Sequence, residues 1–146
     1  METHAKNETT LPVLVVDDDS GIRETVRLTL EDEGYVVLEA PDGRTALGEL
    51  RSSARPLIVL LDHLMPELDG LETLDTIAAD PLLAQRHAYI MLTADGRSEP
   101  VRLTSGGDEW KIPIVAKPFD LEDLLAAVAQ ARDSLLAAPR QYTDKR

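Results

Sequence analysis

Carboxylate side chains stand directly after two short apolar runs of this sequence. The triplet 17–19 (Asp-Asp-Asp) follows the run 11–16, and Asp62 follows the run 57–61. Two carboxylates about 4 Å apart repel by about 4 kcal/mol at an effective dielectric constant of 20. Such a cluster therefore holds a proton or binds a cation. Oxygen ligands suit Mg²⁺, which takes one or two carboxylates together with waters and a phosphate oxygen.

A hydroxyl and an ammonium group end two further apolar runs. Thr93 follows the run 89–92, and Lys117 follows the run 112–116. Beside a bound cation, these groups can hold the oxygens of a phosphoryl group while one carboxylate attacks the phosphorus to form an acyl phosphate. The four run ends predict phosphoryl chemistry if the fold brings them together.

The runs must be strands for these side chains to meet. Short apolar runs alternate five times with amphipathic stretches, which predicts right-handed strand–helix–strand units and a parallel sheet with helices on both faces. In such an α/β fold, ligands bind at the carboxyl ends of the strands. The expected strands cover residues 11–16, 35–38, 57–61, 89–92 and 112–116.

The segment before the last strand is the least regular part of the pattern. Residues 95–111 predict one short helix around Pro100 to Thr104, followed by a break at Gly106 and Gly107. The fifth strand is interrupted by Pro113. We expect Trp110 to serve in packing.

Composition limits the classes of function. The chain has 146 residues, no cysteine and a net charge of −12, so we expect no binding to nucleic acid or to anionic membranes. No apolar run approaches the ~20 residues that span a bilayer, and we expect a cytoplasmic protein. We expect a flexible extension over 1–10, one domain over 11–138 and a polar tail over 139–146.

Four segments together resemble a known family. They are VLVVDDDSGIR at 13–23, LIVLLDHLMPELDGLE at 57–72, YIMLTA at 89–94 and AKPF at 116–119. In order and spacing they are similar to the receiver domain of bacterial two-component response regulators. The resemblance covers about 11–137 and implies a doubly wound, flavodoxin-like (βα)5 sandwich with a parallel sheet of strand order 2-1-3-4-5.

The resemblance also implies roles for the acidic residues. Asp62 corresponds to the phosphoacceptor. Asp17 and Asp18 correspond to the acidic pair that holds Mg²⁺, with Asp18 the more direct ligand. The backbone carbonyl of Leu64 and the Asp62 side chain would complete the metal site.

Further roles and one departure follow from the later motifs. Thr93 corresponds to the switch hydroxyl and Lys117 to the ion-pairing lysine, and the bond from Lys117 to Pro118 is expected to be cis. The family usually has Tyr or Phe three residues before the lysine, where this chain has Ile114. We expect His63 to lie beside the site, partly exposed and on the other side of its strand from Asp62.

The resemblance implies a receiver that takes a phosphoryl group from a sensor histidine kinase or a histidine phosphotransfer protein. About ten residues follow Leu136, too few for a DNA-binding module, so we expect a stand-alone receiver. It would signal by contact with a downstream protein or act within a phosphorelay. The sequence leaves both a monomer and a homodimer open. Such a protein is a phosphoacceptor rather than an enzyme. We expect slow autodephosphorylation, because the apolar Leu64 side chain should impede an attacking water.

Two other functions stay open at the level of sequence. Asp17 and Asp19 after an apolar strand resemble the nucleophile motif of haloacid-dehalogenase-like phosphatases, with Asp17 as nucleophile, although Gly21 stands where that family has Thr or Val. The other alternative is a receiver-like interaction module that is not phosphorylated. The irregular segment before Lys117 supports the second alternative.

Overall fold

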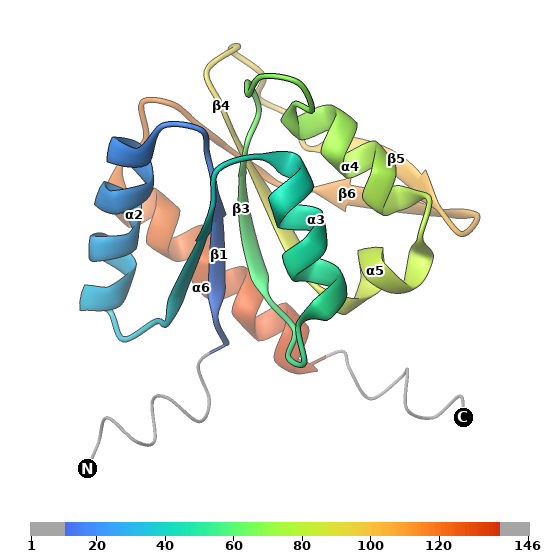
Figure 1. The fold of residues 1–146 in the computed structure, drawn as a ribbon, viewed down its shortest axis with the longest axis horizontal. Coiled ribbons are helices and arrows are strands. Elements are labelled where there is room, and N and C mark those ends of the chain that lie inside the picture. The colour runs from blue at the N-terminus through green and yellow to red at the C-terminus, as the bar shows by residue number, and fades with distance from the viewer. Residues whose placement is uncertain (1–10, 138–146) are drawn as a thin grey trace.

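The predicted parallel sheet is present in the computed structural model, which describes residues 11–137 (Figure 1). Within this range five parallel strands lie in the order β2-β1-β3-β4-β7, so the predicted fold class and order are confirmed, with β7 as the fifth strand. The strands are β1 (Val13–Val16), β2 (Val37–Ala40), β3 (Ile58–Asp62), β4 (Ala88–Thr93) and β7 (Ile114–Ala116). The extension and tail expected at 1–10 and 139–146 lie outside the described residues.

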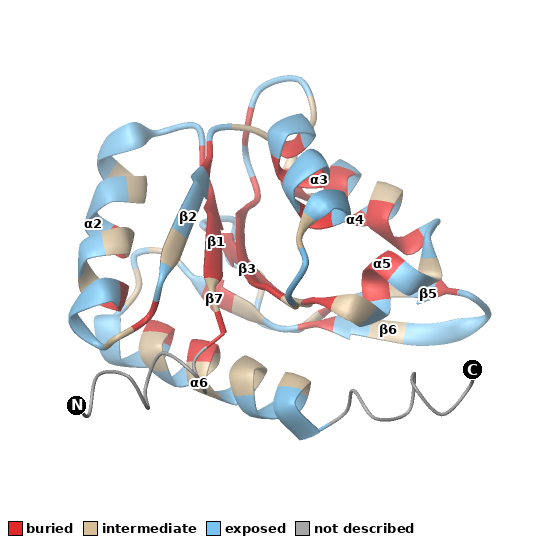
Figure 2. Ribbon diagram, turned by 60° about the horizontal axis from the view of Figure 1, so that its bottom comes forward, coloured by how far each residue is buried: buried red, intermediate tan, exposed pale blue. Residues whose placement is uncertain are grey.

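Helices cover both faces of the sheet. The described helices are α2 (Ser20–Asp32), α3 (Gly43–Ser52), α4 (Gly70–Ala78), α5 (Pro81–Arg86) and α6 (Leu121–Ala137). The packing of α2 and α6 buries one set of alternating strand residues, and that of α3, α4 and α5 buries the other. The central strands β1 and β3 are therefore buried along their length (Figure 2). None of these helices combines the length and apolar character needed to cross a membrane.

The prediction of a helix around Pro100 to Thr104 is wrong. The chain instead forms an antiparallel hairpin of β5 (Val101–Ser105) and β6 (Asp108–Ile112). Gly106 and Gly107 connect the strands with φ values of 62° and 88°. A two-residue hairpin turn with positive φ at both positions matches the right-handed twist of its strands, and glycine adopts it without steric cost.

The hairpin packs on the α4 and α5 side of the sheet. Val101 and Ile112 are buried in the same cluster as residues of β3 and β4. The Ser105 hydroxyl donates a hydrogen bond of 2.7 Å to the carbonyl of Ala78, at the end of α4. Trp110 meets the ring of Tyr89 edge to face, 5.3 Å between centroids, as its expected packing role requires. Residues 101–112 thus pack against the sheet as a hairpin, where the sequence pattern predicts a short helix.

Candidate functional site

Strand register brings the predicted site residues to one edge of the sheet. Val16 of β1 pairs with Leu61 of β3, so the next residues, Asp17 and Asp62, are neighbours. On the other side of β3, Asp62 pairs with Leu92, and Thr93 of β4 pairs with Ala116 of β7. The polar residues of neighbouring strands are therefore at most one register position apart. They lie together at the carboxyl ends of the strands, as expected for a parallel sheet.

The acidic cluster consists of Asp17, Asp18 and Asp62. One carboxylate oxygen from each lies within 4.8 Å of the others. Asp17 and Asp62 are buried, whereas Asp18 is exposed. Burial raises the pKa of Asp17, the backbone N–H of Asp19 opposes that shift, and the Asp62 charge adds to it.

One buried carboxylate oxygen of this cluster accepts no hydrogen bond. Asp17 Oδ1 accepts a hydrogen bond of 2.9 Å from the Asp19 N–H, but the buried Oδ2 has no hydrogen-bond partner. The Lys117 ammonium lies 3.6 Å from this oxygen, beyond hydrogen-bond distance. A buried oxygen without a hydrogen bond is costly, and a hard cation would satisfy it. The donor set of three carboxylates therefore fits Mg²⁺.

Asp19 has a different task. Its side chain accepts from the N–H groups of Gly21 and Ile22, at 2.9 and 3.2 Å, and so caps the first turn of α2. The cap accounts for one residue of the aspartate triplet and leaves Asp17 and Asp18 for the cluster.

Lys117 approaches the cluster from β7. Its Nζ donates to Asp62 Oδ1 at 2.6 Å and lies 3.6 Å from Asp17 Oδ2. Burial lowers the pKa of Lys117, but the hydrogen bond to Asp62 and the charges of Asp62 and Asp17 raise it overall, so the ammonium stays charged at neutral pH. The bond from Lys117 to Pro118 is cis, as the resemblance implied. Three carboxylates and one ammonium leave two negative charges, which a divalent cation would balance.

Thr93 is buried, and its hydroxyl contacts His63. His63 Nδ1 lies 3.1 Å from Thr93 Oγ1, and the N–H of Asp95 donates to the same oxygen at 3.3 Å. The expected partial exposure of His63 is wrong, because only 9% of the residue is exposed. Since Asp62 pairs with Leu92, His63 comes beside Thr93. Sequence alternation could not identify this partner because it depends on the register of two strands.

The Thr93, His63 and Asp95 side chains do not form a nucleophilic triad. Asp95 Oδ2 is 3.6 Å from His63 Nδ1, the same nitrogen that faces the hydroxyl. In a triad, the carboxylate and the nucleophile contact different ring nitrogens, so that the imidazole can accept a proton from the nucleophile.

Leu64 lies in the loop between β3 and α4, and the residue is 66% exposed. Leu64 is thus two residues after Asp62 and open to solvent. The role of its carbonyl as a metal ligand stays a prediction.

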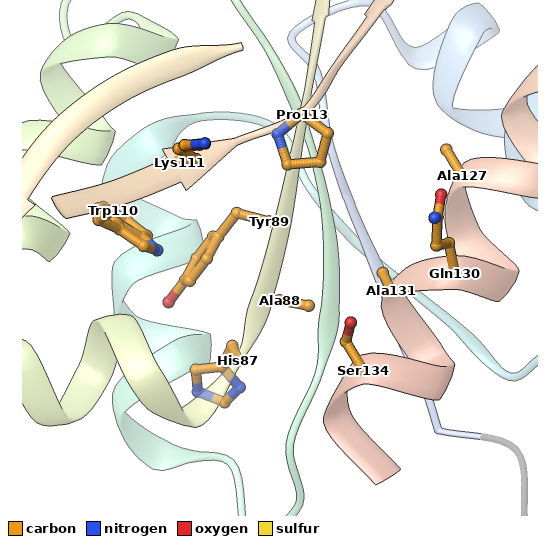
Figure 3. Close-up of a pocket in the computed structure, with 10 residues that line it drawn as sticks. All are labelled: His87, Ala88, Tyr89, Trp110, Lys111, Pro113, Ala127, Gln130, Ala131 and Ser134. Carbon is orange, nitrogen blue, oxygen red and sulfur yellow. The ribbon is translucent and has the colours of Figure 1, made fainter. Parts of the chain in front are cut away.

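A separate hollow of about 400 Å³ lies at the opposite end of β4 (Figure 3). Ala88, at the start of that strand, lines it, whereas Thr93 ends the strand at the acidic edge. Trp110 and Pro113 form one wall, and Gln130 of α6 stands on another. None of its lining residues belongs to the acidic cluster, so this hollow is no part of the candidate phosphoryl site.

The doubly wound sheet with an acidic carboxyl edge defines the class as a flavodoxin-like α/β protein. The family model described as the response regulator receiver domain matches residues 13–129. The chain belongs to this family of two-component signalling domains.

Individual relatives agree with this assignment. Response regulator MprA of Mycolicibacterium vanbaalenii is 45% identical over 118 residues, covering 78% of this chain and 47% of the relative. The chain thus spans about half the length of the curated relatives it matches. Among solved structures, a CheY-like receiver domain protein from Methanospirillum hungatei has a TM-score of 0.67 at 33% identity, covering 85% of this chain and 93% of that one. Chemotaxis protein CheY4 of Vibrio cholerae has a TM-score of 0.65 at 28% identity, covering 84% and 98%.

Proposed function

We propose that Asp62 accepts a phosphoryl group from a phosphohistidine of a sensor histidine kinase or histidine phosphotransfer protein. The observation that carries the proposal is the contact of Lys117 Nζ with Asp62 Oδ1 at 2.6 Å, beside an Asp17 oxygen that accepts no hydrogen bond. A carboxylate between an ammonium group and a cation site is suited to receive a phosphoryl group. Membership of the receiver family supports the same role.

In the transfer, one Asp62 oxygen attacks the phosphorus and the bond from phosphorus to the imidazole nitrogen breaks. The donor imidazole keeps the electron pair of that bond. Asp17, Asp18, Asp62 and the Leu64 carbonyl would hold Mg²⁺, which neutralises phosphoryl oxygens when bound. Lys117 would turn from the Asp62 carboxylate to a phosphoryl oxygen, and the buried Thr93 would donate its hydroxyl proton to another.

Signalling would then follow from a shift between two conformations of the domain. We propose that the chain acts in the cytoplasm by contact with a downstream protein or within a phosphorelay, as a phosphoacceptor rather than an enzyme. We expect slow autodephosphorylation, since the apolar and exposed Leu64, two residues after Asp62, would hinder an attacking water.

Intact mass after incubation with acetyl phosphate tests the proposal. We expect one added phosphoryl group in the wild type with Mg²⁺, and none without Mg²⁺ or in Asp62→Ala. Asp75→Ala is the matched control, because Asp75 is exposed on α4 and outside the cluster, and it should keep the adduct. An adduct that persists in Asp62→Ala but is lost in Asp17→Ala would favour the phosphatase chemistry. No adduct in the wild type would favour a non-phosphorylated interaction module.

A further inference from the structure

We propose that His63 is a positioning residue that orients the Thr93 hydroxyl toward a phosphoryl group on Asp62. This inference rests on the proposed function. The proposed function gives roles to the acidic cluster, Thr93 and Lys117 but none to the buried imidazole of His63, and this inference supplies that role.

The hydrogen-bond inventory around Thr93 carries the argument. A hydroxyl has one proton to donate and two lone pairs that accept. The Asp95 N–H, which can only donate, occupies one lone pair of Thr93 Oγ1 at 3.3 Å. The nearest other partner is His63 Nδ1 at 3.1 Å.

The carboxylate of Asp95 decides which ring nitrogen of His63 carries the proton. Asp95 Oδ2 lies 3.6 Å from Nδ1, and a nearby anion favours the tautomer with a proton on the nitrogen that faces it. His63 Nδ1–H then donates to Thr93 Oγ1. Both lone pairs of the hydroxyl are occupied, so its own proton remains to be donated to another acceptor.

A phosphoryl oxygen is such an acceptor. Without the imidazole, one lone pair of Thr93 Oγ1 would have no donor, and the hydroxyl could rotate away from the phosphoryl site. The Asp95 carboxylate, whose pKa is lowered by the Arg97 N–H and in part by a hydrogen bond from the Thr93 side chain, competes for the hydroxyl proton. His63 therefore reduces the reorganisation that the hydroxyl needs when the phosphoryl group arrives, which is how preorganised donors assist a reaction.

The backbone of His63 is held on both sides. Its N–H donates to the Leu92 carbonyl at 3.0 Å, and its carbonyl accepts from the Gly70 N–H at 2.8 Å. A Cβ at position 70 would lie 2.9 Å from His63 Cα, so only glycine lets α4 begin this close to the histidine. The main chain at His63 is consequently held between the end of β4 and the start of α4, and the ring contacts Thr93 from this position.

A double-mutant cycle tests the inference through the rate of adduct formation with acetyl phosphate and Mg²⁺. His63→Leu should slow phosphorylation about three- to tenfold, the range expected for one neutral hydrogen bond. In the Thr93→Ala background, the same substitution should change nothing, because the hydroxyl it positions is gone. His63→Asn, which can place an amide donor near the position of Nδ1, should recover most of the rate.

Controls separate positioning from packing. His63→Gln places the amide one bond further from the backbone, so its phosphorylation should remain as slow as that of His63→Leu. If His63→Leu does not fold, the comparison of His63→Asn with His63→Gln tests the inference. Equal slowing by His63→Leu with and without Thr93 would show a packing role and overturn the inference. In ¹⁵N NMR of the wild type, we expect the His63 proton on Nδ1, and a proton only on Nε2 would also overturn it.

The two proposals fail in different ways. No adduct in the wild type would overturn the proposed function and this inference together. An adduct in the wild type that forms at the same rate in His63→Leu would overturn the role of His63 alone.

Discussion

Lowering the pH from 7 to 5 should destabilise the domain by about 2 kcal/mol through His87 alone. This side chain is 3% exposed at the start of β4. Its Nδ1 accepts from the Leu57 N–H at 2.9 Å, and its Nε2 lies 3.0 Å from the Leu50 carbonyl. An amide N–H only donates and a carbonyl only accepts, so the neutral ring with its proton on Nε2 satisfies both partners.

A second proton would have to sit on Nδ1, facing the Leu57 N–H. Burial lowers the pKa of His87 from 6.5 to about 4, which the hydrogen bond to the Leu50 carbonyl only partly opposes. Between pH 6.5 and 4, His87 is protonated in the unfolded chain but stays neutral in the folded chain. The free energy of unfolding therefore falls as the pH drops from 6.5 toward 4. At about 1.4 kcal/mol per pH unit, the loss is about 2 kcal/mol at pH 5 and about 3 kcal/mol near pH 4.

Urea unfolding at pH 7, 6 and 5 measures this loss in the wild type and in His87→Gln. Glutamine stays uncharged, so the variant lacks this source of pH dependence, while every other titrating group is common to both proteins. The free energy of unfolding of the wild type should fall by about 2 kcal/mol more than that of the variant between pH 7 and 5. Equal losses in the two proteins would refute the reasoning, as would a His87 pKa near 6.5 by NMR.

Three further substitutions test the energetics of the site and the hairpin. Asp17→Asn should raise the melting temperature by about 3 °C without Mg²⁺ and remove any stabilisation by Mg²⁺ in thermal unfolding, because burial raises the pKa of Asp17 and its ionised form costs stability at pH 7. Gly70→Ala should destabilise by about 2 kcal/mol in urea, because the new Cβ would lie 2.6 Å from the Asp62 carbonyl oxygen. Ser105→Ala should cost about 1 kcal/mol in urea by removing the hydrogen bond to Ala78, and no change would show that the bond does not hold the hairpin to α4.

The sequence by itself determined the parallel sheet and the candidate site residues at its edge. Five apolar runs predict five strands, and the carboxyl ends of parallel strands share one edge whatever the details of packing. Asp17, Asp62 and Lys117 each follow such a run directly, so their meeting depends only on the strand order.

Only the tertiary structure decided the hairpin and the surroundings of the two buried histidines. An isolated two-stranded hairpin is marginal in water, so residues 101–112 adopt it because Val101 and Ile112 bury against the sheet. His63 meets Thr93 through the register of β3 and β4, and His87 stays neutral because of backbone groups at Leu57 and Leu50. These partners are 30 to 37 residues away along the chain, beyond the reach of local periodicity.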